Sequence, residues 1–444
     1  MNPRLTITRW LGRTVLWCSP SNVIAEGNHW FGWGNRSHSV LQPERFGRDP
    51  AGSKRKVRHR SAKLGFAAEV PGILGGIMRI LIATGVVLLL TGGGLPAQGL
   101  FKVGAAQRAF VPEKPYNWRG AKTHALVTAV WYPADSASVE KPQWVGPLNA
   151  PLFAVGSAAP DARPAAGRFP LVVLSHGTGG SALMLGWLGT TLAAHGYIAA
   201  AVNHPGNNAL EPYTPAGFSL WWERATDLSE VIDQMLADSE FAARIDSGRI
   251  GAAGFSLGGY TTIELAGGIS DRAAYREFCN SKAADAICKS PPEFPQLVDY
   301  FNRLDEAGKS DPEIAGSLQR EREPHRDSRV HAVFALAPAM GPAFRPAALS
   351  KIGIPVQIVA GREDDNVPIA SGAEYFAAHI PGSKLVLLRG GVQHYQFLGS
   401  CTAAGRQSLP LLCTDRPGVN RDAVHERTRA MAVQFFDTQL KTPK

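Results

Sequence analysis

A serine between two glycines, in Gly254-Phe255-Ser256-Leu257-Gly258, constrains the fold of this chain more than any other feature. The residues that precede it from Ile250 are small or apolar, as in a buried strand, and a helix-like run follows from Tyr260 to Gly267. Glycines two positions before and after a serine leave room for a sharp turn between strand and helix. Such a turn projects the Ser256 hydroxyl and places the Leu257 amide at a helix N-terminus. The pattern predicts a nucleophile elbow; a glycine-rich turn with an incidental serine is the alternative.

Strand-like and helix-like runs alternate along most of the chain after residue 97. Strands are expected at residues 126–132, 169–174, 197–202, 250–255, 330–336, 355–360 and 384–388, and helices at 183–195, 223–237, 371–379 and 422–440. Residues 134–168 are rich in proline, alanine and glycine and are expected to be loop. This alternation predicts one α/β domain over residues 98–444, with a mostly parallel central sheet and helices on both faces.

Residues 271–328 differ from their surroundings in composition. They contain 21 charged residues in 58 positions and five prolines. We expect a cap inserted after the helix that follows Ser256; a long, partly disordered surface excursion is the alternative. A segment this charged does not readily expose the contiguous apolar patch that binding to an oil surface requires.

The basic excess of the chain lies in its first 97 residues. They carry 13 Lys and Arg against 4 Asp and Glu, whereas the remainder carries 33 of each, so the net charge of +9 belongs to the N-terminal part. Nucleic-acid binding by the folded part is therefore not expected. Residues 78–97 have a charged start, an apolar run at 80–90 and small residues, in the order of a secretory signal peptide. The run is too short for a stable membrane span.

An internal signal peptide suggests that translation begins at Met78 and that residues 1–77 are a mis-assigned extension. The alternative is a genuine basic, disordered tail with a short interfacial anchor. Export fits the four cysteines after residue 97, which allow three disulfide connectivities. Local pairing, Cys279 with Cys288 and Cys401 with Cys413, is favoured over four free thiols in a reducing cytosol.

A serine nucleophile needs a base and a group that orients the base. In folds with this turn the acid and then the histidine follow the serine along the chain. Asp364 and Asp365 both follow the strand at 355–360, and His394 follows the strand at 384–388. His379 and His425 fall in helical runs, where packing or surface roles are the simpler interpretation.

The stretch Ser175-His-Gly-Thr-Gly-Gly180 follows another strand and is a candidate second source of oxyanion donors, with the Thr178 amide as the candidate group. The same glycines match a dinucleotide-binding fingerprint. That interpretation requires an acidic residue at the end of the next strand, where this chain has Asn203-His204. A nicotinamide dehydrogenase is therefore not favoured.

Together these motifs resemble those of bacterial α/β-hydrolases of the platelet-activating-factor acetylhydrolase and dienelactone-hydrolase-like group. The matching stretches are Trp131-Tyr-Pro133, Ser175-His-Gly-Thr-Gly179, Asn203-His-Pro-Gly206, Gly254-Phe-Ser-Leu-Gly258, Gly361-x-x-Asp364 and His394 before an aromatic residue. The resemblance implies an α/β-hydrolase fold with Ser256 as nucleophile, Asp364 rather than Asp365 as the acid, and His394 as the base. It also implies that the Thr178 and Leu257 amides form the oxyanion hole.

We therefore expect a serine hydrolase that cleaves carboxylic esters. The segment 78–97 predicts a periplasmic or secreted location, and the charged segment 271–328 predicts small esters with short acyl groups. No cofactor or metal is expected, because the sequence offers no cluster of metal ligands. Dienelactone hydrolases proper use a cysteine nucleophile, whereas this chain has Ser256. An acyltransferase with the same triad and a non-catalytic binding protein are the alternatives. Apolar side chains near the predicted site either line a small pocket or belong to the core: Met184, Trp187, Trp221 and Trp222.

Overall fold

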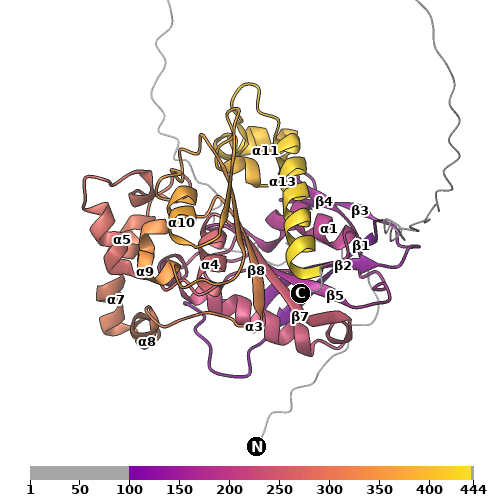
Figure 1. The fold of residues 1–444 in the computed structure, drawn as a ribbon, viewed down its shortest axis with the longest axis horizontal. Coiled ribbons are helices and arrows are strands. Elements are labelled where there is room, and N and C mark those ends of the chain that lie inside the picture. The colour runs from indigo at the N-terminus through magenta and orange to yellow at the C-terminus, as the bar shows by residue number, and fades with distance from the viewer. Residues whose placement is uncertain (1–99, 442–444) are drawn as a thin grey trace, which may run out of the picture. The chain divides into compact units, whose positions relative to one another are not determined.

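The computed structural model describes residues 100–441 (Figure 1). The predicted extension at 1–77 and the predicted signal peptide at 78–97 lie outside these residues and stay predictions. Among the described residues, no helix is both long and apolar enough to cross a membrane.

An 11-stranded sheet runs through the described part of the chain in the order β10-β9-β8-β7-β5-β6-β2-β1-β4-β11, and β3 pairs with β4. The strands are β1 (Lys102–Phe110), β2 (Leu126–Ala134), β3 (Lys141–Val145), β4 (Phe153–Pro160), β5 (Phe169–Ser175), β6 (Ile198–Val202), β7 (Ile245–Phe255), β8 (Val330–Leu336), β9 (Val356–Gly361), β10 (Lys384–Leu388) and β11 (Ser400–Cys401). The strands from β10 to β6 pair in parallel, and β2 and β1 add antiparallel pairs. The mostly parallel sheet predicted from the sequence is confirmed.

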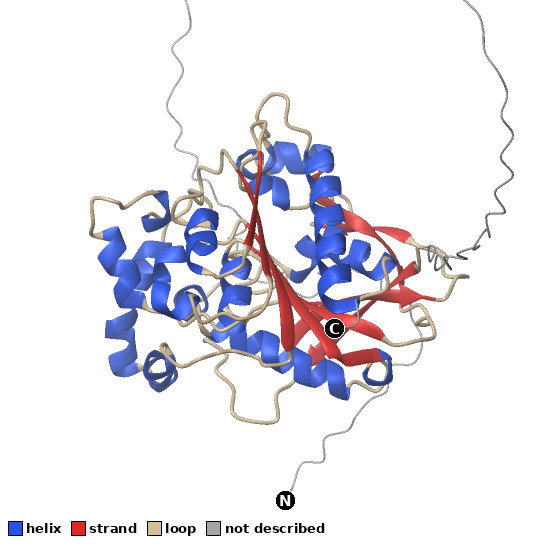
Figure 2. Cartoon of the chain, in the orientation of Figure 1, coloured by secondary structure: helices blue, strands red, loops and turns tan. Residues whose placement is uncertain are grey.

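Helices cover both faces of this sheet (Figure 2). The principal ones are α1 (Gly186–Ala194), α3 (Glu223–Ala237), α4 (Leu257–Leu265), α10 (Ala373–His379) and α13 (Arg421–Phe436). The helices α1 and α13 contact each other on one face, and α3 contacts α4 on the other. The parallel strands between them are almost entirely buried, as β5, β6 and β8 illustrate, and this explains their continuous apolar sequences.

The loop predicted for residues 134–168 is wrong, because β3 and β4 lie there. The register of β3 against β4 shifts between Pro142 and Trp144, and β4 ends at Pro160. Proline is tolerated in edge strands and at bulges, so its presence did not exclude strands near the end of the sheet.

The segment 271–328 folds into helices between α4 and β8, which are α5 (Arg272–Cys279), α6 (Leu297–Asn302), α7 (Leu304–Ser310) and α8 (Pro312–Arg320). Many of its charges pair with one another; Arg272, for example, lies 2.7 Å from Glu321 and 2.9 Å from Asp305. The predicted disulfides, Cys279–Cys288 and Cys401–Cys413, are both present. The first of them closes a loop inside the inserted segment.

Candidate active site

Ser256 lies at the turn between β7 and α4 with a backbone conformation that residues other than glycine rarely adopt. Its φ is 57° and its ψ is −119°. The Ser256 amide donates to the Leu336 carbonyl at 2.8 Å, and the Ala339 amide donates to the Ser256 carbonyl at 3.2 Å. A Cβ atom on Gly254 would overlap the Gly258 carbonyl. The neighbouring backbone therefore holds this serine in a strained turn that needs glycine close by.

The His394 side chain lies between Ser256 and Asp364. His394 Nε2 is 2.9 Å from Ser256 Oγ, and His394 Nδ1 is 2.7 Å from Asp364 Oδ2. A carboxylate only accepts hydrogen bonds, so Nδ1 carries the proton and Nε2 is left to accept the serine proton. The three residues lie on loops that follow β7, β9 and β10. These three strands belong to the same half of the sheet.

The two adjacent aspartates, equal candidates by position, have different surroundings. The second carboxylate oxygen of Asp364 accepts from the Asn366 amide at 3.1 Å and the Val367 amide at 2.8 Å, and the residue is only 7% exposed. Asp365 is exposed and accepts from Gln393 Nε2 at 2.7 Å. The structure thus joins Asp364, and not Asp365, to His394.

The two predicted oxyanion donors lie on backbone next to Ser256. Leu257 is the first residue of α4, and an amide at this position has no hydrogen-bond acceptor within the helix. Thr178 follows β5, and a Cβ atom on the neighbouring Gly177 would lie 3.2 Å from the Ser256 Cβ. Within residues 100–441, neither amide donates to another residue. Both amides are therefore available to a ligand.

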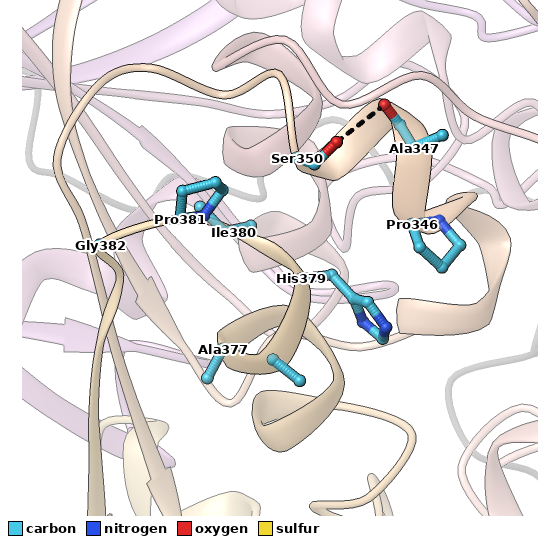
Figure 3. A pocket seen from close by; sticks show the side chains of 9 residues that line it. Pro346, Ala347, Ser350, Ala377, His379, Ile380, Pro381 and Gly382 are labelled. Carbon is cyan, nitrogen blue, oxygen red and sulfur yellow. Dashed lines mark hydrogen bonds between the residues drawn. The ribbon is translucent and has the colours of Figure 1, made fainter.

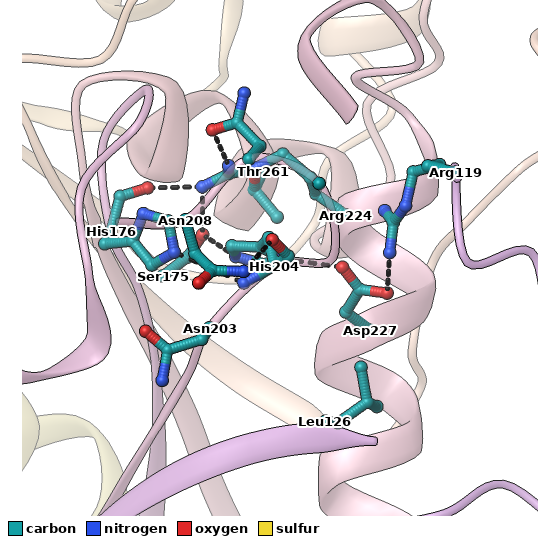
Figure 4. Close-up of polar contacts among 12 residues, drawn as sticks. Arg119, Leu126, Ser175, His176, Asn203, His204, Asn208, Arg224, Asp227 and Thr261 are labelled. Atoms are coloured by element: carbon teal, nitrogen blue, oxygen red, sulfur yellow. Dashed lines mark hydrogen bonds and ion pairs between the residues drawn. The ribbon is translucent and has the colours of Figure 1, made fainter. Parts of the chain in front are cut away.

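A second Ser-His-Asp set consists of Ser175, His204 and Asp227 (Figure 4). His204 Nε2 is 2.8 Å from Ser175 Oγ, and His204 Nδ1 is 2.7 Å from Asp227 Oδ2. All three side chains are completely buried. Asp227 also accepts from Tyr116 and from Arg119, the latter at 2.7 Å. The complete burial of His204 agrees with a role in the core.

Arg224 joins this second set to the Thr178 loop. Its guanidinium donates to the His176 carbonyl, to Ser175 Oγ at 3.3 Å and to Asn207 Oδ1 at 3.1 Å, and the same Asn207 oxygen accepts from the Gly179 amide at 2.9 Å. Burial lowers the pKa of Arg224 to about 9, so it stays charged at neutral pH.

Sequence reasoning missed this network, although a signal was available. Arg224 and Asp227 lie three residues apart on α3, on the same face as Leu228 and Val231, and all four are buried. Charged residues in the apolar stripe of an amphipathic helix indicate buried groups that have polar partners elsewhere in the fold.

The three tryptophans near the predicted site, for which pocket and core roles were both open, are core residues. Trp187, Trp221 and Trp222 are 3% exposed or less, and the Trp187 ring stacks on His425 with centroids 4.3 Å apart. Burial lowers the pKa of His425 to about 4. Met184 is only partly buried and packs beside the Cys401–Cys413 disulfide. The core interpretation of the tryptophans is therefore the correct one.

A surface pocket elsewhere on the molecule contains another candidate histidine (Figure 3). It lies between α9 (Pro346–Leu349) and α10, and His379 is among its lining residues. His379 Nδ1 is 2.8 Å from the Tyr375 carbonyl on its own helix. In the part of the chain that the structure describes, no group of three or more His, Cys, Asp and Glu side chains could hold a metal ion.

Comparisons with known proteins agree with this architecture. The sequence profile of the family described as platelet-activating factor acetylhydrolase, isoform II, matches residues 152–216. A ferulic acid esterase from Streptomyces cinnamoneus superimposes with a TM-score of 0.52 at 22% identity, over 78% of this chain and 92% of that one. The chain has the α/β-hydrolase fold. The predicted resemblance to the acetylhydrolase and dienelactone-hydrolase-like group is also confirmed.

Two curated relatives match parts of this α/β-hydrolase. A bis(hydroxyethyl) terephthalate hydrolase from Streptomyces coelicolor is 28% identical over 196 residues, which are 44% of this chain and 56% of the relative. Cutinase est2 from Thermobifida alba is 32% identical over 97 residues, 21% of this chain and 29% of the relative. The chain thus matches little more than half of the first relative and under a third of the second.

Proposed function

We propose that this α/β-hydrolase cleaves carboxylic esters through Ser256, His394 and Asp364. The observation that carries the proposal is the unbroken hydrogen-bonded series from the Ser256 hydroxyl through the His394 ring to the Asp364 carboxylate. A hydroxyl in such a series gives up its proton to the imidazole as it attacks a carbonyl carbon. The relatives, which are named as a bis(hydroxyethyl) terephthalate hydrolase, a cutinase and a ferulic acid esterase, support the same class of reaction.

The reaction proceeds in two halves. Ser256 Oγ bonds to the ester carbon while its proton passes to His394 Nε2, and the Leu257 and Thr178 amides donate to the resulting oxyanion. The carbon–oxygen bond to the alcohol then breaks as His394 returns the proton to the leaving oxygen. Water attacks the acyl-serine in the same manner and releases the acid and free Ser256. Asp364 keeps the Nδ1 proton in place throughout.

Small esters with short acyl chains are the proposed substrates. Three of the five aromatic side chains of the inserted segment, Tyr275, Phe294 and Phe301, are 9% exposed or less, and the other two are partly buried. Such a segment does not supply the apolar outer surface that an oil interface requires. The two disulfides fit an oxidising compartment, which agrees with the proposed periplasmic or secreted location.

A series of nitrophenyl esters with acyl chains of 2 to 12 carbons tests this function. We expect kcat/KM to be highest for acetate or butyrate, the rate not to jump above the solubility limit of the ester, and Ser256→Ala to remove the activity. An added alcohol measures acyl transfer against hydrolysis and so tests the acyltransferase alternative. A preference for emulsified long-chain triglyceride would contradict the substrate class, and full activity of Ser256→Ala would contradict the mechanism.

A further inference from the structure

Two consecutive residues of the inserted segment contact the two loops that flank Ser256. The first, Glu293, accepts a hydrogen bond from the Tyr395 hydroxyl at 2.7 Å. Tyr395 follows His394 directly, and the two rings meet edge-on with centroids 5.6 Å apart. Glu293 is therefore attached to the loop that carries the proposed catalytic base.

The second residue, Phe294, lies against the loop that carries Thr178. A Cβ atom on Gly179 would overlap the Phe294 ring, so the ring packs directly on that backbone. The ring also makes edge contacts with Tyr213 at 5.3 Å and Phe218 at 5.0 Å between centroids. The Tyr213 hydroxyl donates to the Gly179 carbonyl at 2.9 Å. An aromatic group of three residues from two segments thus packs beside the loop of the proposed oxyanion donor.

These contacts place one dipeptide across the approach to Ser256. Successive Cα atoms are about 3.8 Å apart, so Glu293 and Phe294 reach the two loops from nearly the same point. The exposure of the nucleophile agrees with such a cover, because Ser256 is 8% exposed and His394 is 2% exposed.

The dipeptide is fixed by the fold around it. The Phe294 amide donates to the Pro291 carbonyl at 2.9 Å, and Ser290 Oγ accepts from the Val298 amide at 2.9 Å. Just before this turn, the Cys279–Cys288 disulfide closes its loop. The position of Phe294 is therefore determined without a substrate, as a selectivity element requires.

We propose that Phe294 limits the size of the acyl group and that the Glu293–Tyr395 pair limits the size of the alcohol group. This inference rests on the proposed ester hydrolysis. The acyl carbon must lie beside the oxyanion donors, on the Phe294 side, and the leaving oxygen must lie beside His394, on the Tyr395 side. A ring that cannot move without losing its aromatic contacts excludes a branched or aryl acyl group while admitting acetyl.

The test compares 4-nitrophenyl acetate with 4-nitrophenyl benzoate, which share a leaving group. In Phe294→Ala we expect the ratio of kcat/KM for benzoate to that for acetate to rise about tenfold or more, in line with the effect of a few methylene groups in a pocket. The acetate kcat should stay within a few-fold of wild type. For Tyr395→Phe we expect a smaller gain, confined to esters with bulky alcohols.

Phe278→Ala is the matched control, because it makes the same truncation on α5 of the same inserted segment, outside this aromatic group. Its benzoate-to-acetate ratio should equal that of wild type. If Phe294→Ala fails to fold, Phe294→Leu, which keeps an apolar side chain at the site, should still raise the ratio. A second readout is the rate at which small and bulky phosphonates label Ser256, followed by mass spectrometry.

An unchanged ratio in a folded Phe294 variant would overturn the inference, and so would an equal loss for both esters. The failure of the proposed function has a different signature. If wild type and Ser256→Ala hydrolyse esters equally, the mechanism is wrong. If wild type is active, Ser256→Ala is inactive and the benzoate-to-acetate ratio does not change in the Phe294 variants, the selectivity assignment alone is wrong.

Discussion

The molecule contains two Ser-His-Asp sets that share their hydrogen-bond pattern and differ in their surroundings. In the set of Ser256 the two distances to the histidine are 2.9 and 2.7 Å, and in the set of Ser175 they are 2.8 and 2.7 Å. Distances alone therefore do not tell which serine reacts. The backbone distinguishes the two serines, because Ser256 lies on a strained turn with a positive φ, whereas Ser175 ends the regular strand β5.

The charges around the two sets differ in the same way. Asp364 accepts from two backbone amides, whereas Asp227 faces the Arg119 guanidinium at 2.7 Å. Ser175 Oγ also accepts from Arg224, a partner that the Ser256 hydroxyl does not have among the described residues. Among the described residues, the Ser256 hydroxyl has His394 as its one side-chain partner and lies near two amides without a hydrogen-bond acceptor. The side-chain polar atoms of Ser175, His204 and Asp227 are all hydrogen-bonded to other buried or half-buried groups.

Alanine at each serine should separate the two sets by the largest margin. Ser256→Ala should lower kcat by about 10⁶-fold, or roughly 8 kcal/mol, because the nucleophile is lost while binding remains. Ser175→Ala should keep most of kcat and lower the free energy of unfolding by about 1–3 kcal/mol, because Arg224 and His204 lose a buried partner. Ester kinetics and urea unfolding of both variants measure the contrast. An inactive but stable Ser175→Ala would reverse the assignment.

Replacement by asparagine should lower the activity at Asp364 and the stability at Asp227. Asp364→Asn should lower kcat by about 10⁴-fold, because the amide does not hold the reactive tautomer of His394. Asp227→Asn should cost about 3–5 kcal/mol of unfolding free energy, because Arg119 is left as a buried charge without its carboxylate. Asp365→Asn is the neighbouring control, and its activity should be close to that of wild type. If Asp365→Asn is the inactive variant, the acid is misassigned.

The Ser256 set could be proposed from the sequence because its constraints are local. Gly254 and Gly258 are needed for the turn itself, and Asp364 and His394 follow recognisable strands. The parallel strands could also be predicted from the sequence, because strands that are buried on both faces are apolar throughout. Strand β4 could not be predicted in this way, because it mixes small residues, glycine and proline like a loop.

The network around His204 and the contacts of Phe294 could not be predicted, because they join residues that are distant in sequence. Asp227 meets Tyr116 and Arg119 across more than 100 positions, and Phe294 meets Gly179 across a similar separation. The aromatic residues of the inserted segment look dispersed along the chain, yet they gather on Phe218 and Trp221 once it is folded. Tertiary packing decides such contacts, and no local pattern encodes it.

The smallest of the expected differences is in the pH dependence of stability, and it reports the protonation of His204. Burial, followed by the nearby Arg224 and Arg119 cations, holds the pKa of His204 well below its ordinary value of 6.5. The folded protein thus keeps His204 neutral at a pH where the unfolded chain takes up a proton. Because the unfolded state then binds more protons, stability falls as the pH drops below about 6.5, by roughly 1.4 kcal/mol per pH unit for this group.

His204→Asn should make that slope shallower by the same roughly 1.4 kcal/mol per pH unit, since asparagine keeps an N–H toward Asp227 and does not titrate. Urea unfolding of wild type and variant between pH 4.5 and 7.5 measures the difference between the two curves. The buried Glu264, whose pKa is raised by burial, is present in both proteins, and its contribution cancels in that difference. Parallel curves would mean that the folded protein protonates His204. In that case the Ser175 set would hold a buried imidazolium, and its contrast with the Ser256 set would rest on exposure and backbone strain alone.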